Sequence, residues 1–298
     1  MAFFSAQSED EPVKKTQSRD AVKRRPHISN QQRECMTDLD DQRPMFGNYQ
    51  LKPNSGVNPP YSPAYPVEWG CTLRTLEVIT RVDPRKVANL LADAPFDMVN
   101  DRVAFRFIAS PGHSLAVHAG RMFDLMITVP VRYEGLFTET HIFMYCSDPM
   151  GICAGREVFG YTKKDTHYAF DERSDGSISG CVRRRGFPLA DFSFTPDATA
   201  PIVRIVEGAE QPGGEIHVRR LPHPERLETA YADVVYRRTP LKYSAPLPGR
   251  ASMTLHSCAY DPIAELEPEI LGAHFMVSDV YGGGFDVEDR RLIKRLTP

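Results

Sequence analysis

The sequence predicts a mainly β protein, a β-barrel or β-sandwich with a few short helices. Two observations favour this class. Short apolar runs rich in β-branched and aromatic residues recur along the chain, with turn-forming residues between them. Strands and helices do not alternate as they would in a protein built on a parallel sheet. Many short strands without that alternation are typical of barrels and sandwiches.

The elements are expected in the following order. An apolar stretch that contains Leu73 ends at Arg81 and predicts the first strand. Asp83-Pro84 then supplies an N-cap and a first-turn proline, which predicts a helix from about 84 to 93. Further strands are expected at 103–109, 122–133, 137–146, 178–184, 201–206, 215–219, 231–237, 251–255 and 270–281. The turn at 133–135 should join two of them into a hairpin.

The N-terminal part differs in composition from the rest. Residues 1–50 are polar and lack a periodic apolar pattern, so we expect a disordered or draped arm that cannot offset the entropy of ordering. Residues 51–68 hold five prolines and should be extended. Segments of this kind can wrap a neighbouring protomer, which leads us to expect a homo-oligomer. Residues 69–298 are expected to form a single domain.

Composition and charge exclude several classes of partner. The 298-residue chain is 41% hydrophobic and 25% charged, with a formal net charge of −3, so it should not attract nucleic acid or anionic membranes. No apolar run approaches the ~20 residues that cross a bilayer. The first residues lack the charge and apolar length of a secretory signal. We therefore expect a cytoplasmic protein without a nucleic-acid or membrane partner.

No motif for metal, phosphate or serine-hydrolase chemistry stands out. His113 and His118, like His217 and His223, lack the H-E-x-x-H spacing and a nearby third ligand, so no metal site is expected. The glycines at 282–284 lack phosphate-loop spacing, and no G-x-S-x-G elbow occurs. The six cysteines form no C-x-x-C pair and are expected to be free thiols in a reducing compartment.

Residues 154–164 set two adjacent lysines, Lys163 and Lys164, directly after an aromatic and apolar run. If one lysine entered an apolar pocket beside the other, desolvation and like-charge repulsion would both lower its pKa and leave a nucleophilic amine. The alternative is a solvated turn, because lysine is rarely buried. For an arbitrary lysine pair the spacing alone favours the solvated turn.

The residues around this pair carry a family resemblance. The segment Gly155-Arg156-Glu157-x-x-x-Tyr161-x-Lys163-Lys164 resembles the G-R-E-x-x-x-Y-P-K-K motif of the acetoacetate decarboxylase family. Residues 80–83 and 248–281 resemble its opening and closing strands, so the similarity runs from about 70 to 285. The resemblance implies an acetoacetate decarboxylase-like catalytic domain over 69–298, with a β-barrel, surrounding strands and a few short helices.

The resemblance also implies roles for individual residues. Lys163 falls on the lysine that forms an imine with substrate, and Lys164 on the neighbour associated with its lowered pKa, in a family that is itself the standard example of such a lysine. Asp124 falls where the family carries an active-site glutamate. Arg106 replaces another family glutamate, and Arg74 lies one position from the family's carboxylate-binding arginine. We expect Arg106 or Arg74 to bind a substrate carboxylate.

These residues imply a cofactor-independent decarboxylase that acts on a small β-keto acid through a Schiff base. The first alternative keeps the imine but performs aldol, dehydration or cyclisation chemistry, and the second is a binding protein without catalysis. Asp124, Arg106 and Thr162, the last in place of the motif's proline, change the charge and shape of the pocket, so a substrate larger than acetoacetate is plausible. If repulsion from Lys164 lowers the pKa of Lys163, the Lys164→Gln variant should raise it.

Overall fold

The computed structural model describes residues 68–111, 121–208, 211–222, 229–238, 241–258, 260–283 and 289–296; the arm predicted at 1–50 and residues 51–67 of the proline-rich segment lie outside them. The strands are β1 Glu68–Arg81, β2 Asp97–Met98, β3 Arg102–Ser110, β4 Met122–Tyr133, β5 Leu136–Cys146, β6 Lys163–Asp165, β7 His167–Glu172, β8 Ile178–Arg184, β9 Phe187–Pro196, β10 Glu215–Pro222, β11 Thr229–Arg238, β12 Leu241–Tyr243, β13 Leu247–Leu255, β14 Glu269–Gly283 and β15 Asp289–Arg295. The helices are α2 Pro84–Leu91, α3 Pro149–Ala154, a π-helical turn η3 Gly155–Phe159 and a 3₁₀ turn η4 Ile263–Leu266.

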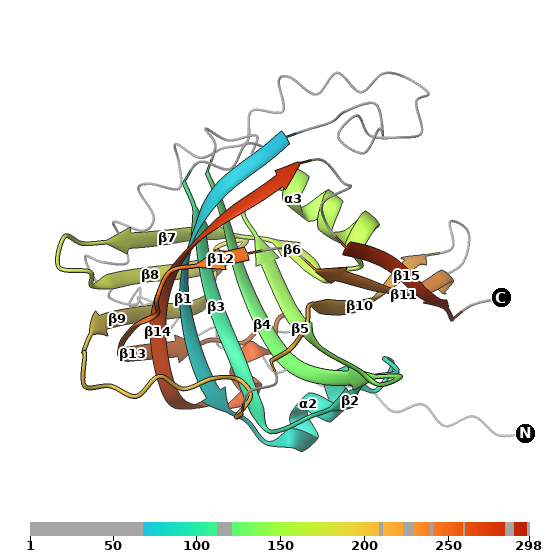
Figure 1. Ribbon diagram of the computed structural model, residues 1–298, viewed down its shortest axis with the longest axis horizontal. Helices are drawn as coiled ribbons and strands as arrows, with labels where there is room; N and C mark the ends of the chain where they lie inside the picture. The colour runs from blue at the N-terminus through green and yellow to red at the C-terminus, as the bar shows by residue number, and fades with distance from the viewer. Residues whose placement is uncertain are drawn as a thin grey trace, which may run out of the picture.

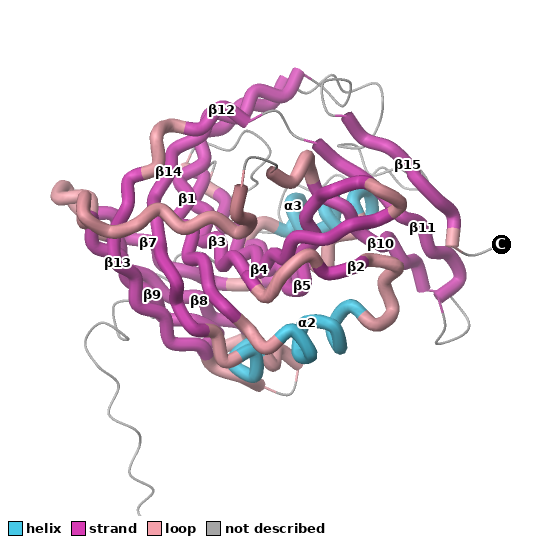
Figure 2. The backbone as a smooth tube through the Cα atoms, turned by 60° about the horizontal axis from the view of Figure 1, so that its bottom comes forward, coloured by secondary structure: helices cyan, strands magenta, loops and turns pink. Residues whose placement is uncertain are grey.

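These strands form one 15-stranded sheet, and the mainly β prediction is confirmed. The main path runs in the order β15-β11-β10-β5-β4-β3-β1-β14-β13-β9-β8-β7, with β2, β6 and β12 pairing beside it. Figure 1 shows the long strands β14, β1, β3, β4 and β5 in the middle, with β7–β9 on one side and β10, β11 and β15 on the other. In the tube view α2 lies next to β2, whereas α3 lies on the side of β10 and β11 (Figure 2). Within the described ranges the path does not close into a complete barrel.

Most predicted elements are present. Asp83 caps α2 by accepting a hydrogen bond from the Arg85 amide at 2.9 Å, and β4 and β5 form the predicted hairpin. The strand predicted at 201–206 is wrong, because Ile205 and Val206 are buried in a segment without ladder pairing. The side chain of Asn100 donates to the Ile205 carbonyl at 3.0 Å, so side chains satisfy this backbone instead.

The thiol prediction is only partly right. Cys146, Cys153 and Cys258 are free, whereas Cys181 is disulfide-bonded. Cys181 belongs to no cysteine motif in the sequence, so motif spacing gave no signal for this disulfide. Within the described ranges, no helix is both long and apolar enough to cross a membrane.

One face of the central strands forms the apolar core. Successive side chains of a strand point to opposite faces, so Phe105 and Phe107 of β3 share a face. Phe107 stacks on Phe192 of β9 with ring centroids 4.0 Å apart, and Phe123 of β4 stacks on Tyr168 of β7 at 4.1 Å. Strands β7–β9 therefore cover this face, and each fully buried side chain of this size contributes about 1.5–3 kcal/mol.

The opposite face of the same strands is polar. One row of cross-strand partners on it runs, from β14 to β6, through His274, Glu77, Arg106, Met126, Met144 and Lys163. Asp124 lies two residues before Met126 on β4 and therefore shares this face. The strand alternation thus gathers residues from distant parts of the sequence on one side of the sheet.

Arg106 is the centre of a buried charge network on the polar face. Its Nε lies 2.6 Å from Glu77 Oε1, and its Nη2 lies 2.9 Å from Glu139 Oε1. His274 Nε2 lies 3.1 Å from Glu77 Oε2. Burial alone raises the pKa of Glu77, but the charge of Arg106 and the hydrogen bond from His274 outweigh it and lower that pKa to about 2. The network ties β1, β3, β5 and β14 together.

This network predicts acid sensitivity. Because the pKa of Glu77 falls from 4.5 to about 2 on folding, its contribution to stability is present above pH 4.5 and is lost as the pH falls toward 2. The Glu77→Gln variant should lower the free energy of unfolding at pH 7 by about 3 kcal/mol, since breaking a buried ion pair costs about 3–5 kcal/mol. It should also flatten the acid dependence. Urea unfolding at pH 7 and pH 3 measures both effects.

The matched control is Glu172→Gln, which removes the partner of the more exposed Arg74. A part-exposed pair contributes about 0–1 kcal/mol, so this variant should lose much less stability. Equal losses in the two variants would contradict the structural role given to Arg106.

Candidate active site

A helix–turn unit delivers the lysine pair to β6. Asp148 caps α3 by accepting a hydrogen bond from the Gly151 amide at 2.8 Å, and α3 continues into the π-helical turn η3. Gly160 then ends the turn with φ +76, where a Cβ would lie 2.7 Å from the Cα of Arg219. Only glycine tolerates both that conformation and that contact. The chain then enters β6 at Lys163.

Lys163 is buried, with 6% of its surface exposed, and its Nζ lies 2.9 Å from Asp124 Oδ1. The stem of the lysine crosses Gly155, where a Cβ would lie 2.7 Å from the lysine Cδ. The same Nζ lies 5.8 Å from the centre of the Tyr161 ring. The structure thus brings together the glycine, the tyrosine and the first lysine of the motif with Asp124 of β4. The motif positions 155, 161 and 163 are therefore spaced so that Gly155 and Tyr161 both contact the Lys163 side chain.

The pKa of Lys163 differs from the sequence expectation. Burial is the largest single influence and lowers it, but the charge of Asp124, the nearby Cys146 and the hydrogen bond to Asp124 together outweigh burial, and the net pKa lies above its usual value of 10.5. Arg237 of β11 is a positive charge that acts to lower it. In this state Lys163 and Asp124 therefore form an ion pair, and the amine needs to lose its proton before it can act as a nucleophile.

Lys164 points to the other face of the sheet. Its Nζ donates to Asp261 Oδ1 at 2.8 Å and to the Tyr260 carbonyl at 2.8 Å. Asp261 also accepts from Arg184 Nη1 at 2.8 Å and from the Tyr145 hydroxyl at 3.1 Å. Lys164 is thus held in an ion-pair cluster on the side of Tyr145, away from the Asp124 side of β6.

The two arginines expected at a substrate carboxylate lie apart from Lys163. Arg106 is held by Glu77 and Glu139, and Met126 and Met144 separate it from Lys163 along the row. Arg74 Nε lies 2.6 Å from Glu172 Oε2. A substrate carboxylate would have to displace a glutamate from either guanidinium.

Sequence reasoning missed Arg237. Its guanidinium carbon lies 4.4 Å from the centre of the Phe159 ring, and its Nη1 donates to the Tyr161 hydroxyl at 2.6 Å. Burial raises the pKa of Tyr161 well above its usual value, so the phenol keeps its proton. In the sequence, Arg237 stands beside Arg238 at the end of a predicted strand. Charged residues are common at strand ends, so nothing in the sequence indicated that Arg237 lies beside Lys163.

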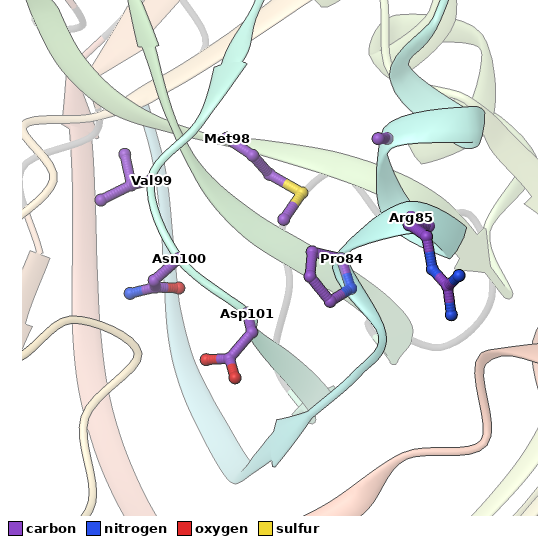
Figure 3. Close-up of a pocket in the computed structure, with 7 residues that line it drawn as sticks. Pro84, Arg85, Met98, Val99, Asn100 and Asp101 are labelled. Atoms are coloured by element: carbon purple, nitrogen blue, oxygen red, sulfur yellow. The ribbon is translucent and has the colours of Figure 1, made fainter.

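A surface hollow of about 500 Å³ lies elsewhere, at the corner formed by α2 and β2 (Figure 3). Pro84, Arg85, Ala88 and residues 98–101 line it. Its one acidic side chain, Asp101, lies 3.3 Å from Arg81 Nε in an exposed ion pair. No lysine, cysteine or histidine lines this hollow, so it is a poor candidate for catalysis.

The sequence relatives are acetoacetate decarboxylases. The family model "Acetoacetate decarboxylase (ADC)" matches residues 54–292. The chain is similar to "Acetoacetate decarboxylase 2" of Mesorhizobium japonicum, at 26% identity over 74% of this chain and 83% of that protein. It is also similar to an acetoacetate decarboxylase of Bordetella avium, at 25% identity over 77% of this chain and 92% of that protein.

The similar solved structures share the fold at low sequence identity. An acetoacetate decarboxylase structure superposes with a TM-score of 0.66 at 16% identity, over 82% of this chain and 97% of that chain. The enduracididine biosynthesis enzyme MppR, solved with pyruvate, superposes with a TM-score of 0.61 at 16% identity, over 77% of this chain and 91% of that chain. With the family model matched over most of its length, the chain belongs to the acetoacetate decarboxylase (ADC) family.

Proposed function

We propose that the protein is an imine-forming decarboxylase of a small β-keto acid, with Lys163 as the nucleophile. The observation that carries the proposal is the buried Lys163 amine, 2.9 Å from Asp124 and packed on Gly155 in the motif that this family uses. A buried lysine beside a carboxylate has both a nucleophile and a proton acceptor within reach.

The first step is a proton transfer across the ion pair. The Lys163 ammonium gives its proton to Asp124, which leaves a neutral amine and a neutral carboxylic acid in the buried site. The amine nitrogen then attacks the ketone carbon, and the carbonyl electrons move to oxygen. A proton passes from nitrogen to oxygen, and the proton on Asp124 completes the departing water. The products are an iminium ion on Lys163, one water and the Asp124 carboxylate.

The iminium ion then takes up the electrons of the breaking bond. The bond between the substrate's α-carbon and its carboxylate breaks, carbon dioxide leaves, and the electron pair moves through the α-carbon to the nitrogen to give an enamine. Protonation of the α-carbon and hydrolysis by water release the ketone and restore Lys163. Asp124 lies close enough to the nitrogen to exchange these protons.

In this proposal Arg237 binds the substrate carboxylate, the role that the sequence suggested for Arg106 or Arg74. It lies against Phe159 and Tyr161, beside the lysine, and its Nη1 donates to the Tyr161 hydroxyl. Its positive charge opposes protonation of Lys163 and would attract a substrate carboxylate. The aromatic neighbours suit a keto acid with a short apolar part.

The second candidate keeps the imine and replaces decarboxylation with aldol or dehydration chemistry. It is favoured by structures of MppR with pyruvate and with the condensation product of pyruvate and imidazole 4-carboxaldehyde, each with a TM-score of 0.61 to this chain. Both reactions begin with the same iminium ion. They differ in the next step, because decarboxylation breaks the bond to the carboxylate, whereas aldol chemistry forms a carbon–carbon bond from the enamine.

Borohydride trapping tests the proposal. Incubation with acetoacetate or with pyruvate, reduction and peptide mass spectrometry should show the adduct mass on Lys163 and none in the Lys163→Gln variant. Release of carbon dioxide from the β-keto acid supports the decarboxylase, and an aldehyde-dependent condensation product from pyruvate supports the second candidate. Absence of any adduct on Lys163 with both acids would refute both candidates.

The Asp124→Asn variant should affect borohydride trapping of the imine and catalytic turnover differently. Because Asp124 raises the pKa of Lys163, its removal should lower that pKa and make the free amine available at lower pH. The final extent of trapping near pH 6 should therefore be retained, but the imine should form more slowly, because Asp124 no longer supplies the proton that completes the departing water. Turnover should fall by about 10²–10⁴-fold, the usual loss on removing a general acid–base group. A variant that traps and turns over like the wild type would show that Asp124 takes no part in the chemistry.

A further inference from the structure

The polar face continues beyond Tyr161 to a cluster that the proposed imine chemistry does not use. His141 of β5 and Glu215 and His217 of β10 have ligand atoms that all lie within 4.8 Å of one another. Both imidazoles are buried at 3% exposure, and the side chain of Glu215 is 26% exposed. Tyr161 packs on this cluster, with its ring centre 4.6 Å from that of His217.

Two features of the sheet assemble the cluster. Glu215 pairs with Glu139 where β10 runs parallel to β5, so His217 and His141, each two residues further along, lie side by side. The pairing of β4 with β5 also shifts register between Ile127 and Thr128, which is a β-bulge. Without that extra residue His141 would share the face of Phe143 in the apolar core, and with it His141 faces Thr128 on the polar side.

The groups around the cluster aim three ligand atoms inward. Thr128 Oγ1 lies 2.9 Å from His141 Nδ1, and Thr140 Oγ1 lies 3.4 Å from His217 Nδ1. The Tyr161 hydroxyl donates to Glu215 Oε2. These contacts leave both imidazole Nε2 atoms buried without a hydrogen-bond partner in the described part of the chain. Glu215 Oε1 lies 3.5 Å from His141 Nε2.

We propose that His141, Glu215 and His217 bind one divalent transition-metal ion through the two Nε2 atoms and Glu215 Oε1. Bonds of about 2.0–2.2 Å are usual for zinc with these ligands, and two imidazoles with one carboxylate form a common three-ligand set that keeps an open position. The 3.5 Å between His141 Nε2 and Glu215 Oε1 suits two ligands of one ion. The hydroxyls on each Nδ1 and on Oε2 are the outer contacts that orient such ligands.

The ligand set also predicts which ions bind. Imidazole nitrogen favours zinc, cobalt, nickel and copper, whereas magnesium and calcium require more oxygen ligands than this cluster supplies. The positive charge of Arg237, which acts on both Glu215 and His217, opposes every divalent cation, so the two imidazole ligands have to supply the affinity. We therefore expect selectivity for zinc and cobalt over magnesium and calcium.

Equilibrium dialysis of the full chain against zinc chloride, with metal analysis, tests the site. We expect one zinc ion per chain with a dissociation constant below ~10 μM. Millimolar magnesium or calcium should not displace it. Cobalt in place of zinc should give the visible absorption of a four- or five-coordinate ion with nitrogen and oxygen ligands. Wild-type protein that retains no zinc at 100 μM would overturn the proposal.

The conservative variants Glu215→Gln and His217→Gln should weaken zinc binding at least tenfold and abolish the cobalt absorption. The matched control is His256→Gln, whose half-exposed imidazole pairs with Asp191 far from the cluster, and it should bind zinc like the wild type. Circular dichroism checks that each variant is folded. If His217→Gln does not fold, the zinc affinity of Glu215→Gln alone tests the site. Equal zinc affinity in wild type, control and folded cluster variants would place the metal elsewhere and refute the site.

Discussion

Side-chain alternation along β6 places Lys163 and Lys164 on opposite faces of one sheet, and the rest of the site depends on this separation. Lys163 faces Asp124 and the polar side, whereas Lys164 faces Asp261 and Tyr145. The Asp261 cluster fixes β6 against β5 and β8, so one lysine anchors the strand that presents the other. Two adjacent lysines thus have different surroundings because the backbone turns them in opposite directions.

The same geometry decides which charge controls the amine. Full burial can lower the pKa of a lysine by up to about 3–5 units. A unit charge 4 Å away contributes about 4 kcal/mol at an effective dielectric constant of 20, which is about 3 units at 1.36 kcal/mol each. Asp124 at 2.9 Å can therefore cancel the effect of burial, and the raised pKa of Lys163 follows. In the proposed mechanism, activation then depends on passing the proton to Asp124, whereas the sequence suggested that repulsion from Lys164 lowers the pKa of Lys163.

The polar face links this chemistry to the rest of the sheet. Tyr161 contacts Arg237 and Glu215, and Glu215 lies beside His141. The Tyr161 side chain therefore contacts both Lys163 and the proposed metal cluster. At the other end of the row, Arg106 holds Glu77 and Glu139 and keeps β1, β3 and β5 in register. The buried charges of Arg106, Lys163 and Asp261 each have a partner of opposite sign, which offsets part of the cost of their desolvation.

The sequence predicted the local features well. Apolar alternation located β3, β4, β5 and β8, and Asp83-Pro84 located α2. The motif around Gly155 drew attention to Lys163, which the structure buries beside Asp124. Features that depend on contacts between distant residues were not predictable. The segment 201–206 has a strand-like pattern because Ile205 and Val206 are buried, yet it pairs with no strand.

The site shows the same division between local and distant signals. Arg106 was expected at a substrate carboxylate because the sequence did not show that Glu77 and Glu139 lie beside it. Arg237 gave no local signal. The histidines were judged by their spacing in sequence, and neither the parallel pairing of β5 with β10 nor the β-bulge that turns His141 was visible there.

The most direct test of the account is a pH titration of the Lys163 amine by nitrogen NMR in protein labelled with ¹⁵N-lysine, with the signal assigned by its loss in Lys163→Gln. We expect a pKa above the ordinary lysine value in the wild type, a lower pKa in Asp124→Asn, and little change in Lys164→Gln. A pKa that rises in Lys164→Gln and does not respond to Asp124→Asn would contradict it, and would show that repulsion between the two lysines controls the nucleophile.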